Sequence, residues 1–118
     1  MTESFASVLL VGIGGAAGAV ARHSVGSVIE SRNSVISVNL IGSFVLGIVL
    51  GIPGASTVMI LVGVGFCGGF TTFSSFTVET VVTAESGEIL LATRFALTNL
   101  IGGVGALILG SVVVSVVF

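Results

Sequence analysis

Long apolar runs separated by short polar loops fill nearly the whole of this chain. Only 7% of its 118 residues are charged, whereas a soluble domain carries about 25%. A helix needs roughly 20 apolar residues to cross the hydrocarbon core of a bilayer. The chain is therefore predicted to be a multi-pass membrane protein with room for four spans and almost no domain outside the membrane.

Polar loops and helix breakers divide the chain into its expected spans. The first loop covers residues 30–34, Pro53-Gly54 interrupts the next apolar run, and residues 84–88 form the last loop. We expect a single all-α domain over residues 1–118, with spans at about 5–29, 35–52, 56–83 and 89–118. Both termini would then lie on the same side of the membrane. The few arginines mark the orientation only weakly, and the chain could insert in both directions.

Glycine recurs inside the spans in a pattern typical of close helix packing. Gly14 and Gly18 are one helical turn apart and leave one face of the first span nearly bare. The second span carries Asn39 and Ser43 on a small-residue face, and the fourth carries Asn99. Polar groups cannot face lipid without a penalty, so these side chains are expected to meet each other or a partner chain. Helices packed through glycine leave no lumen, which favours a dimer with its pathway between subunits.

The run of residues 68–76, GGFTTFSSF, is the least expected stretch in the third span. A glycine pair loosens a helix, and clustered hydroxyls compete with its hydrogen-bond ladder. Backbone freed at membrane depth is tolerated only where it is buried in protein or lines a watery cavity. We therefore expect two half-helices around a break near Gly68 to Thr72, and we interpret this run as the functional centre. The lone Cys67 beside it is interpreted as a small buried apolar side chain.

Three motifs, in this order and at this spacing, resemble those of the Fluc (CrcB) fluoride channels. The motifs are Gly14-Gly15-x-x-Gly18-Ala19-x-x-Arg22, Val38-Asn39-x-x-Gly42-Ser43-Phe44-x-x-Gly47, and the run from Gly65 to Phe76 followed by Glu79. The resemblance implies a fluoride-specific channel of the cell membrane that exports cytoplasmic fluoride passively and relieves its toxicity. It also implies an antiparallel, dual-topology dimer with two pathways, in which the third helix is broken within the membrane.

The resemblance further implies roles for single residues. The backbone carbonyls of Gly68 and Thr71 would bind a structural sodium ion at the centre of the dimer. Phe73 and Phe76 would line the pathways together with Asn39, and Arg22 corresponds to the arginine near the end of the first span. The fourth span departs from the family, because Phe95 and Asn99 stand where Tyr and Ser are usual.

Fluoride is small and strongly hydrated, so a pathway must replace its water with donors that do not trap it. Neutral donors are available from the amides of Asn39 and Asn99 and from the hydroxyls of Ser43, Thr72, Ser74 and Ser75. The edge of an aromatic ring is positive and can face an anion without a buried charge. Each hydroxyl has the alternative role of bonding to nearby backbone, and a phenylalanine outside such a motif would be packed or lipid-facing.

Other readings stay open for the remaining polar residues and for the whole chain. Arg22 either snorkels to the interface or attracts anions at a vestibule. Glu79 is assigned to organising the break or the dimer centre, and His23 to the interface. No set of nucleophile, base and orienting group suggests an enzyme. The alternatives are a proton-coupled exporter of the small multidrug type or a scaffold subunit. The partner is either an identical chain or an oppositely inserted homologue.

Overall fold

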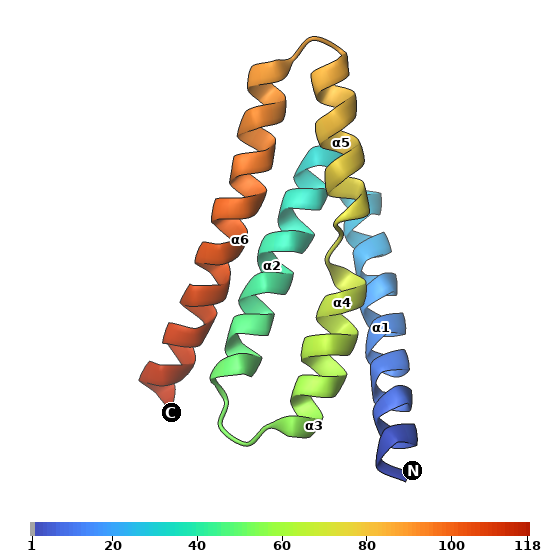
Figure 1. The fold of residues 1–118 in the computed structure, drawn as a ribbon, viewed down its shortest axis with the longest axis vertical. Helices are drawn as coiled ribbons and strands as arrows, with labels where there is room; N and C mark the ends of the chain where they lie inside the picture. The colour runs from blue at the N-terminus through green and yellow to red at the C-terminus, as the bar shows by residue number, and fades with distance from the viewer. Residues whose placement is uncertain (1) are drawn as a thin grey trace.

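The computed structural model describes residues 2–118, and every regular element in that range is a helix. The chain forms α1 (Thr2–Val28), α2 (Ser31–Gly51), α3 (Ser56–Val58), the π-helix η1 (Met59–Phe66), α4 (Cys67–Phe70), α5 (Ser74–Glu85) and α6 (Ile89–Val117). The elements α3 to α5 follow one another along one direction and together make the third long segment (Figure 1).

Within residues 2–118, four helical segments are long and apolar enough to cross a membrane. They are Ser4–Val28, Ser31–Gly51, Ser56–Glu85 and Ile89–Val117. Two of the turns between them contain a glycine in the left-handed region, Gly54 with φ 68° and Gly87 with φ 91°, a conformation that disfavours other residues. The first and last described residues lie at the same end of the molecule (Figure 1), as the sequence predicted.

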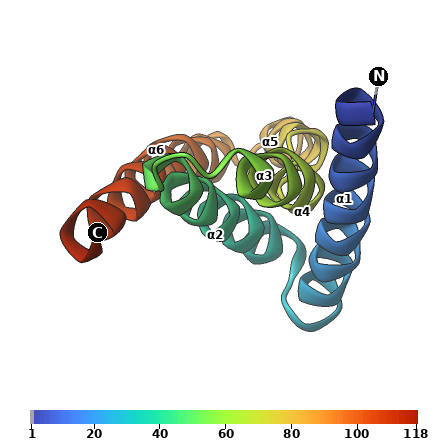
Figure 2. The ribbon, with the colours of Figure 1, turned by 90° about the horizontal axis from the view of Figure 1, so that it is seen from below.

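Helix α1 packs against η1 and α4 through main chain rather than side chains. A methyl group added at Gly14 would collide with the carbonyl oxygen of Leu61, and one added at Gly18 would collide with that of Phe66. Close approach of backbones is the expected result of small residues spaced four apart. The prediction that Gly14 and Gly18 form a packing surface is therefore confirmed, with the third segment as the partner helix. Figure 2 shows α1 standing beside this segment, on the side away from α6.

Helices α2 and α6 run side by side (Figures 1 and 2), and they also approach each other closely at glycines. A methyl group at Gly47 would collide with the carbonyl oxygen of Leu107, and one at Gly110 would collide with that of Phe44. Near the middle of these two helices, Asn39 donates a hydrogen bond to Asn99. The expectation that the polar faces of the second and fourth spans meet each other is thus confirmed within a single chain.

Candidate functional site

The helical ladder of the third segment is interrupted between α4 and α5, at residues 71–73. The main-chain N–H of Thr71 makes the last α-type bond, to the carbonyl oxygen of Cys67 at 3.0 Å, and Thr71 itself is extended (φ −78°, ψ 165°). The interruption begins later than the expected stretch, because Gly68 and Gly69 remain helical. Gly69 instead permits close packing, since a methyl group there would collide with the carbonyl oxygen of Gly15 on α1.

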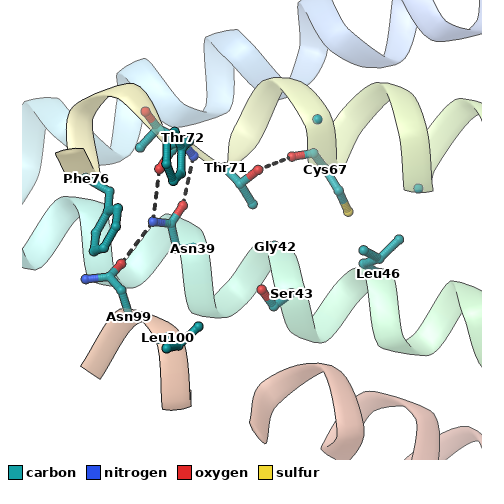
Figure 3. Close-up of a pocket in the computed structure, with 13 residues that line it drawn as sticks. Asn39, Gly42, Ser43, Leu46, Cys67, Thr71, Thr72, Phe76, Asn99 and Leu100 are labelled. Atoms are coloured by element: carbon teal, nitrogen blue, oxygen red, sulfur yellow. Dashed lines mark hydrogen bonds between the residues drawn. The ribbon is translucent and has the colours of Figure 1, made fainter. Parts of the chain in front are cut away.

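One side chain on α2 forms hydrogen bonds with both main-chain groups of Thr72, within this interruption (Figure 3). The Thr72 N–H donates to Asn39 Oδ1 at 2.8 Å, and Asn39 Nδ2 donates to the Thr72 carbonyl oxygen at 3.1 Å. Asn39 Nδ2 also donates to Asn99 Oδ1 at 2.9 Å, while Asn99 Nδ2 donates to the carbonyl oxygen of Phe95 at 3.0 Å. Both amide hydrogens of Asn39 are therefore directed at oxygen atoms of the protein.

The hydroxyl groups next to the interruption bond to nearby backbone. Thr71 Oγ1 donates to the Cys67 carbonyl oxygen at 2.8 Å. Thr72 Oγ1 accepts from the N–H of Ser75 at 3.1 Å and lies 3.5 Å from Ser74 Oγ. A hydroxyl that accepts an N–H three residues later satisfies one of the orphan donors at a helix start. Thr72 therefore helps to begin α5.

Several main-chain groups at the interruption have no hydrogen-bond partner among residues 2–118. The carbonyl oxygens of Gly68 and Thr71 receive no hydrogen bond, because the Thr72 N–H goes to Asn39 and the Ser75 N–H goes to the Thr72 hydroxyl. The N–H groups of Phe73 and Ser74, at the start of α5, donate to no described group. This part of the chain thus offers free acceptors on one side of residue 72 and free donors on the other.

A hollow of about 450 Å³ opens against the interruption (Figure 3). Eight of the candidate site residues predicted from the sequence line it. Its full lining is Asn39, Gly42, Ser43, Leu46, Gly63, Cys67, Gly68, Thr71, Thr72, Phe73, Phe76, Asn99 and Leu100. No residue of this lining is charged. Within residues 2–118 the Ser43 hydroxyl has no hydrogen-bond partner and is not enclosed, so it is a donor available to the hollow.

Two phenylalanine rings form part of this wall and have different surroundings. The Phe76 ring is partly buried and lies 5.7 Å from the Phe95 ring in a stacked arrangement. The Phe73 ring lies 6.0 Å from Phe76 but is 79% exposed. Phe95, the residue that replaces the usual tyrosine, therefore supports Phe76 by stacking, and Phe73 projects from the surface of the single chain.

The other nominated residues lie around smaller hollows closer to the α1–α2 loop. Arg22 and Ser75 share a hollow of about 170 Å³ with Thr72. Ser74 and Ser75 line another of about 410 Å³ together with Glu79. Thr72 borders both the first hollow and the one at Arg22. The structure thus divides the nominated residues into two groups that meet at Thr72.

Sequence reasoning missed several lining residues. Leu46, Leu100 and Gly63 border the main hollow, and Ser34 borders both hollows near Ser75. Leu46 follows Asn39 by seven residues and Leu100 adjoins Asn99, so helical periodicity could have found the first of them. Cys67 is buried (4% exposed), as interpreted, and its position also places it on the wall of the main hollow.

Comparison with known proteins gives a consistent result. The sequence model of a family described as "CrcB-like protein, Camphor Resistance (CrcB)" matches residues 9–111. A protein of Natronomonas pharaonis named Fluoride-specific ion channel FluC 2 is 46% identical over 105 residues, which are 88% of this chain and 90% of that protein. A Methanocaldococcus jannaschii protein named Fluoride-specific ion channel FluC is 34% identical over 119 residues, 94% of this chain and 96% of its own. A protein of the same name from Chlorobium phaeobacteroides is 37% identical over 120 residues, 93% of this chain and 94% of its own.

Proposed function

The chain belongs to the CrcB family, and on that premise we propose that it is a fluoride-specific ion channel of the cell membrane, not an enzyme. Cytoplasmic fluoride leaves through it passively, which relieves fluoride toxicity. The names of the three relatives support the ion and the channel activity. The observation that carries the proposal is the uncharged hollow of about 450 Å³, which brings aromatic rings, a free hydroxyl and the interrupted helix together.

The chemistry of this hollow suits a small anion. A full positive charge would hold fluoride too tightly, whereas neutral donors and ring edges permit both entry and exit. The donors are the Ser43 hydroxyl and the N–H group of Phe73, and the N–H group of Ser74 follows directly in the sequence at the edge of the hollow. These N–H groups lie at the start of α5, where the helix dipole is positive. Phe73 and Phe76 present two neighbouring rings along the same wall.

Arg22 acts on the other side of Thr72. It lies on the wall of a small hollow with Ser75, near the α1–α2 loop. A guanidinium group there raises the local concentration of anions by its field without contacting them in the main hollow. The hydroxyls of Ser74 and Ser75 then lead from this vestibule towards Thr72. Glu79 borders the neighbouring hollow with Ser74 and Ser75 and is assigned to organising the break.

The working unit is a dimer of antiparallel subunits with two pathways. Phe73 is 79% exposed in the single chain although it lies beside Phe76 on the wall of the hollow, and a second subunit would cover it and close the pathway. The second subunit is an identical chain inserted in the opposite direction or a homologue. Crosslinking and mass measurement in mild detergent test this assembly. Efflux activity from a species that is only monomeric would refute it.

The carbonyl oxygens of Gly68 and Thr71 fit a sodium ion at the centre of this dimer. Both oxygens lack a hydrogen-bond partner among residues 2–118, and sodium takes oxygen ligands from unwound backbone. Two copies of the interrupted segment related by a two-fold axis would supply both pairs of carbonyls. The bound ion would contribute positive charge that compensates the exposed carbonyl dipoles. Its role is structural, and the ion is not transported.

Fluoride efflux from proteoliposomes tests the proposed function. The purified chain is reconstituted in vesicles loaded with potassium fluoride, and external fluoride is followed with an electrode after valinomycin is added. We expect rapid fluoride release and no matching release from vesicles loaded with chloride. Release of both anions at similar rates would refute selectivity. Release of neither from vesicles with verified protein incorporation would refute the channel.

A further inference from the structure

The amide groups of Asn39 and Asn99 form a chain of hydrogen bonds that ends on main chain at both sides. It runs from the Phe95 carbonyl oxygen through Asn99 and Asn39 to Thr72. Asn99 and Thr72 are buried, at 8% and 7% exposure. A buried polar group without a partner is costly, so the loss of any bond in this series of hydrogen bonds would destabilise the folded chain.

The main-chain ends fix the direction of both amides. A carbonyl oxygen can only accept, so the nitrogen of Asn99 must face Phe95 and its oxygen must face Asn39. That oxygen needs a donor, so the nitrogen of Asn39 must face Asn99. At the other end, the Thr72 N–H can only donate and therefore requires the oxygen of Asn39. The two ends demand the same orientation, and a reversed Asn39 would place like groups against each other at three contacts.

The Asn39 side chain therefore pairs with both main-chain groups of Thr72, as the backbone of a neighbouring strand does in a β-sheet. It gives an acceptor to the N–H at 2.8 Å and a donor to the carbonyl oxygen at 3.1 Å. These are two of the main-chain groups that the interruption removes from the helical ladder. Thr72 in turn starts α5 through its hydroxyl and precedes Phe73, so its placement sets the positions of the N–H groups and rings that face the hollow.

We propose that Asn39 is a positioning residue that clamps the interrupted helix at Thr72, and that Asn99 acts through Asn39 by fixing the orientation of its amide. Both hydrogens of Asn39 are engaged by protein oxygens in this structure, so its amide is held against the interrupted helix. Fluoride meets the groups that the clamp places. This inference rests on the proposed function for its flux readout, but the clamp itself can be measured without any flux.

Hydrogen exchange at the Thr72 amide tests the clamp directly in the full chain, reconstituted in nanodiscs and followed by NMR. Asn39→Ala removes the acceptor, and its loss is expected to speed exchange about 5- to 150-fold, the range for a coupling of about 1–3 kcal/mol. Asn99→Leu should also speed exchange at Thr72, although Asn99 does not contact Thr72. Thr98→Ala, at an exposed neighbour on α6, is the matched control and should change nothing. Unchanged exchange at Thr72 in Asn99→Leu would overturn the inference.

Efflux gives the second readout, with the fluoride concentration varied. Asn39→Ala should lower the maximal rate and leave the half-saturating concentration unchanged, because it alters how often the pathway is formed and not how the ion is bound. The effects of Asn39→Ala and Asn99→Leu should be non-additive, so that the double variant is no slower than Asn39→Ala alone. Multiplicative losses, or a shift of the half-saturating concentration with the maximal rate retained, would refute the clamp. Absence of efflux in the unmodified chain would refute the proposed function instead, and the exchange experiment would still decide the inference.

Discussion

The contact between α1 and the third segment yields a prediction with a matched control on the same helix. At Gly18, an added Cβ would lie 2.9 Å from the main-chain nitrogen of Phe70 and 3.0 Å from the carbonyl carbon of Phe66, and still closer to the Phe66 oxygen. These neighbours are backbone and cannot rotate away. At Gly12, earlier on the same helix, an added Cβ would have no atom of residues 2–118 within 4 Å apart from its chain neighbours and the nearby backbone of α1 itself.

Alanine at either position gains about 0.5–1 kcal/mol of helix stability over glycine. Gly18→Ala must also force α1 away from α4, and overpacking of this kind costs about 1–3 kcal/mol. Because the helix gain is common to both variants, their difference isolates the packing cost. We therefore expect Gly18→Ala to be about 1–3 kcal/mol less stable than Gly12→Ala.

Equilibrium unfolding in mixed detergent micelles, followed by circular dichroism, measures this difference. Gly12→Ala should be at least as stable as the unmodified chain. Gly18→Ala should also slow fluoride efflux, because the displaced Phe70 directly precedes the interrupted residues 71–73. Equal stabilities for the two variants would show that α1 does not approach α4 through bare backbone.

Further predictions concern the pathway, the ion and the acid. Phe76→Ile removes a ring edge and the stacked contact with Phe95, and such an aromatic contact is worth about 0.5–1.5 kcal/mol. We therefore expect this variant to slow efflux about 2- to 13-fold. Phe5→Ile, at an exposed position, should not slow it. Replacing all sodium by N-methylglucamine should lower efflux or dimer stability, and indifference of both would count against the Gly68 and Thr71 carbonyls. Glu79→Gln should retain selective fluoride efflux and should show no drug efflux. If efflux instead depends on a proton gradient and is lost when the Glu79 carboxyl is replaced, the multidrug-type exporter is favoured.

Hydropathy and glycine spacing were sufficient to predict the spans and their packing faces, because both signals are local. The spacing of Gly14 and Gly18 predicted a close helix contact, but it did not identify η1 and α4 as the partner. The polar faces at Asn39 and Asn99 were correctly expected to meet. The all-helical architecture follows from the same patterns, since helices satisfy their own backbone in lipid.

The details of the site depend on contacts that local patterns do not encode. The helix continues through Gly68 and Gly69, where α1 packs closely against Gly69, so the interruption begins only at Thr71. The bond between Asn39 and Thr72 joins residues 33 positions apart and depends on the relative rotation of two helices. The π-helix over Met59–Phe66 has no signature in its apolar sequence. Motif spacing therefore selected the candidate residues, while their hydrogen-bond partners required the structure.

The reversal potential of the unmodified chain in a planar bilayer shows whether the chain conducts fluoride passively and selectively. A passive, fluoride-specific channel predicts a current that reverses at the fluoride equilibrium potential, shifting by about 59 mV for each tenfold fluoride gradient at 25 °C. The potential should not respond to a chloride gradient or to a pH gradient at constant fluoride. A reversal potential that follows chloride or protons, or a bilayer that carries no fluoride current at all, would show that the chain is not a passive fluoride channel.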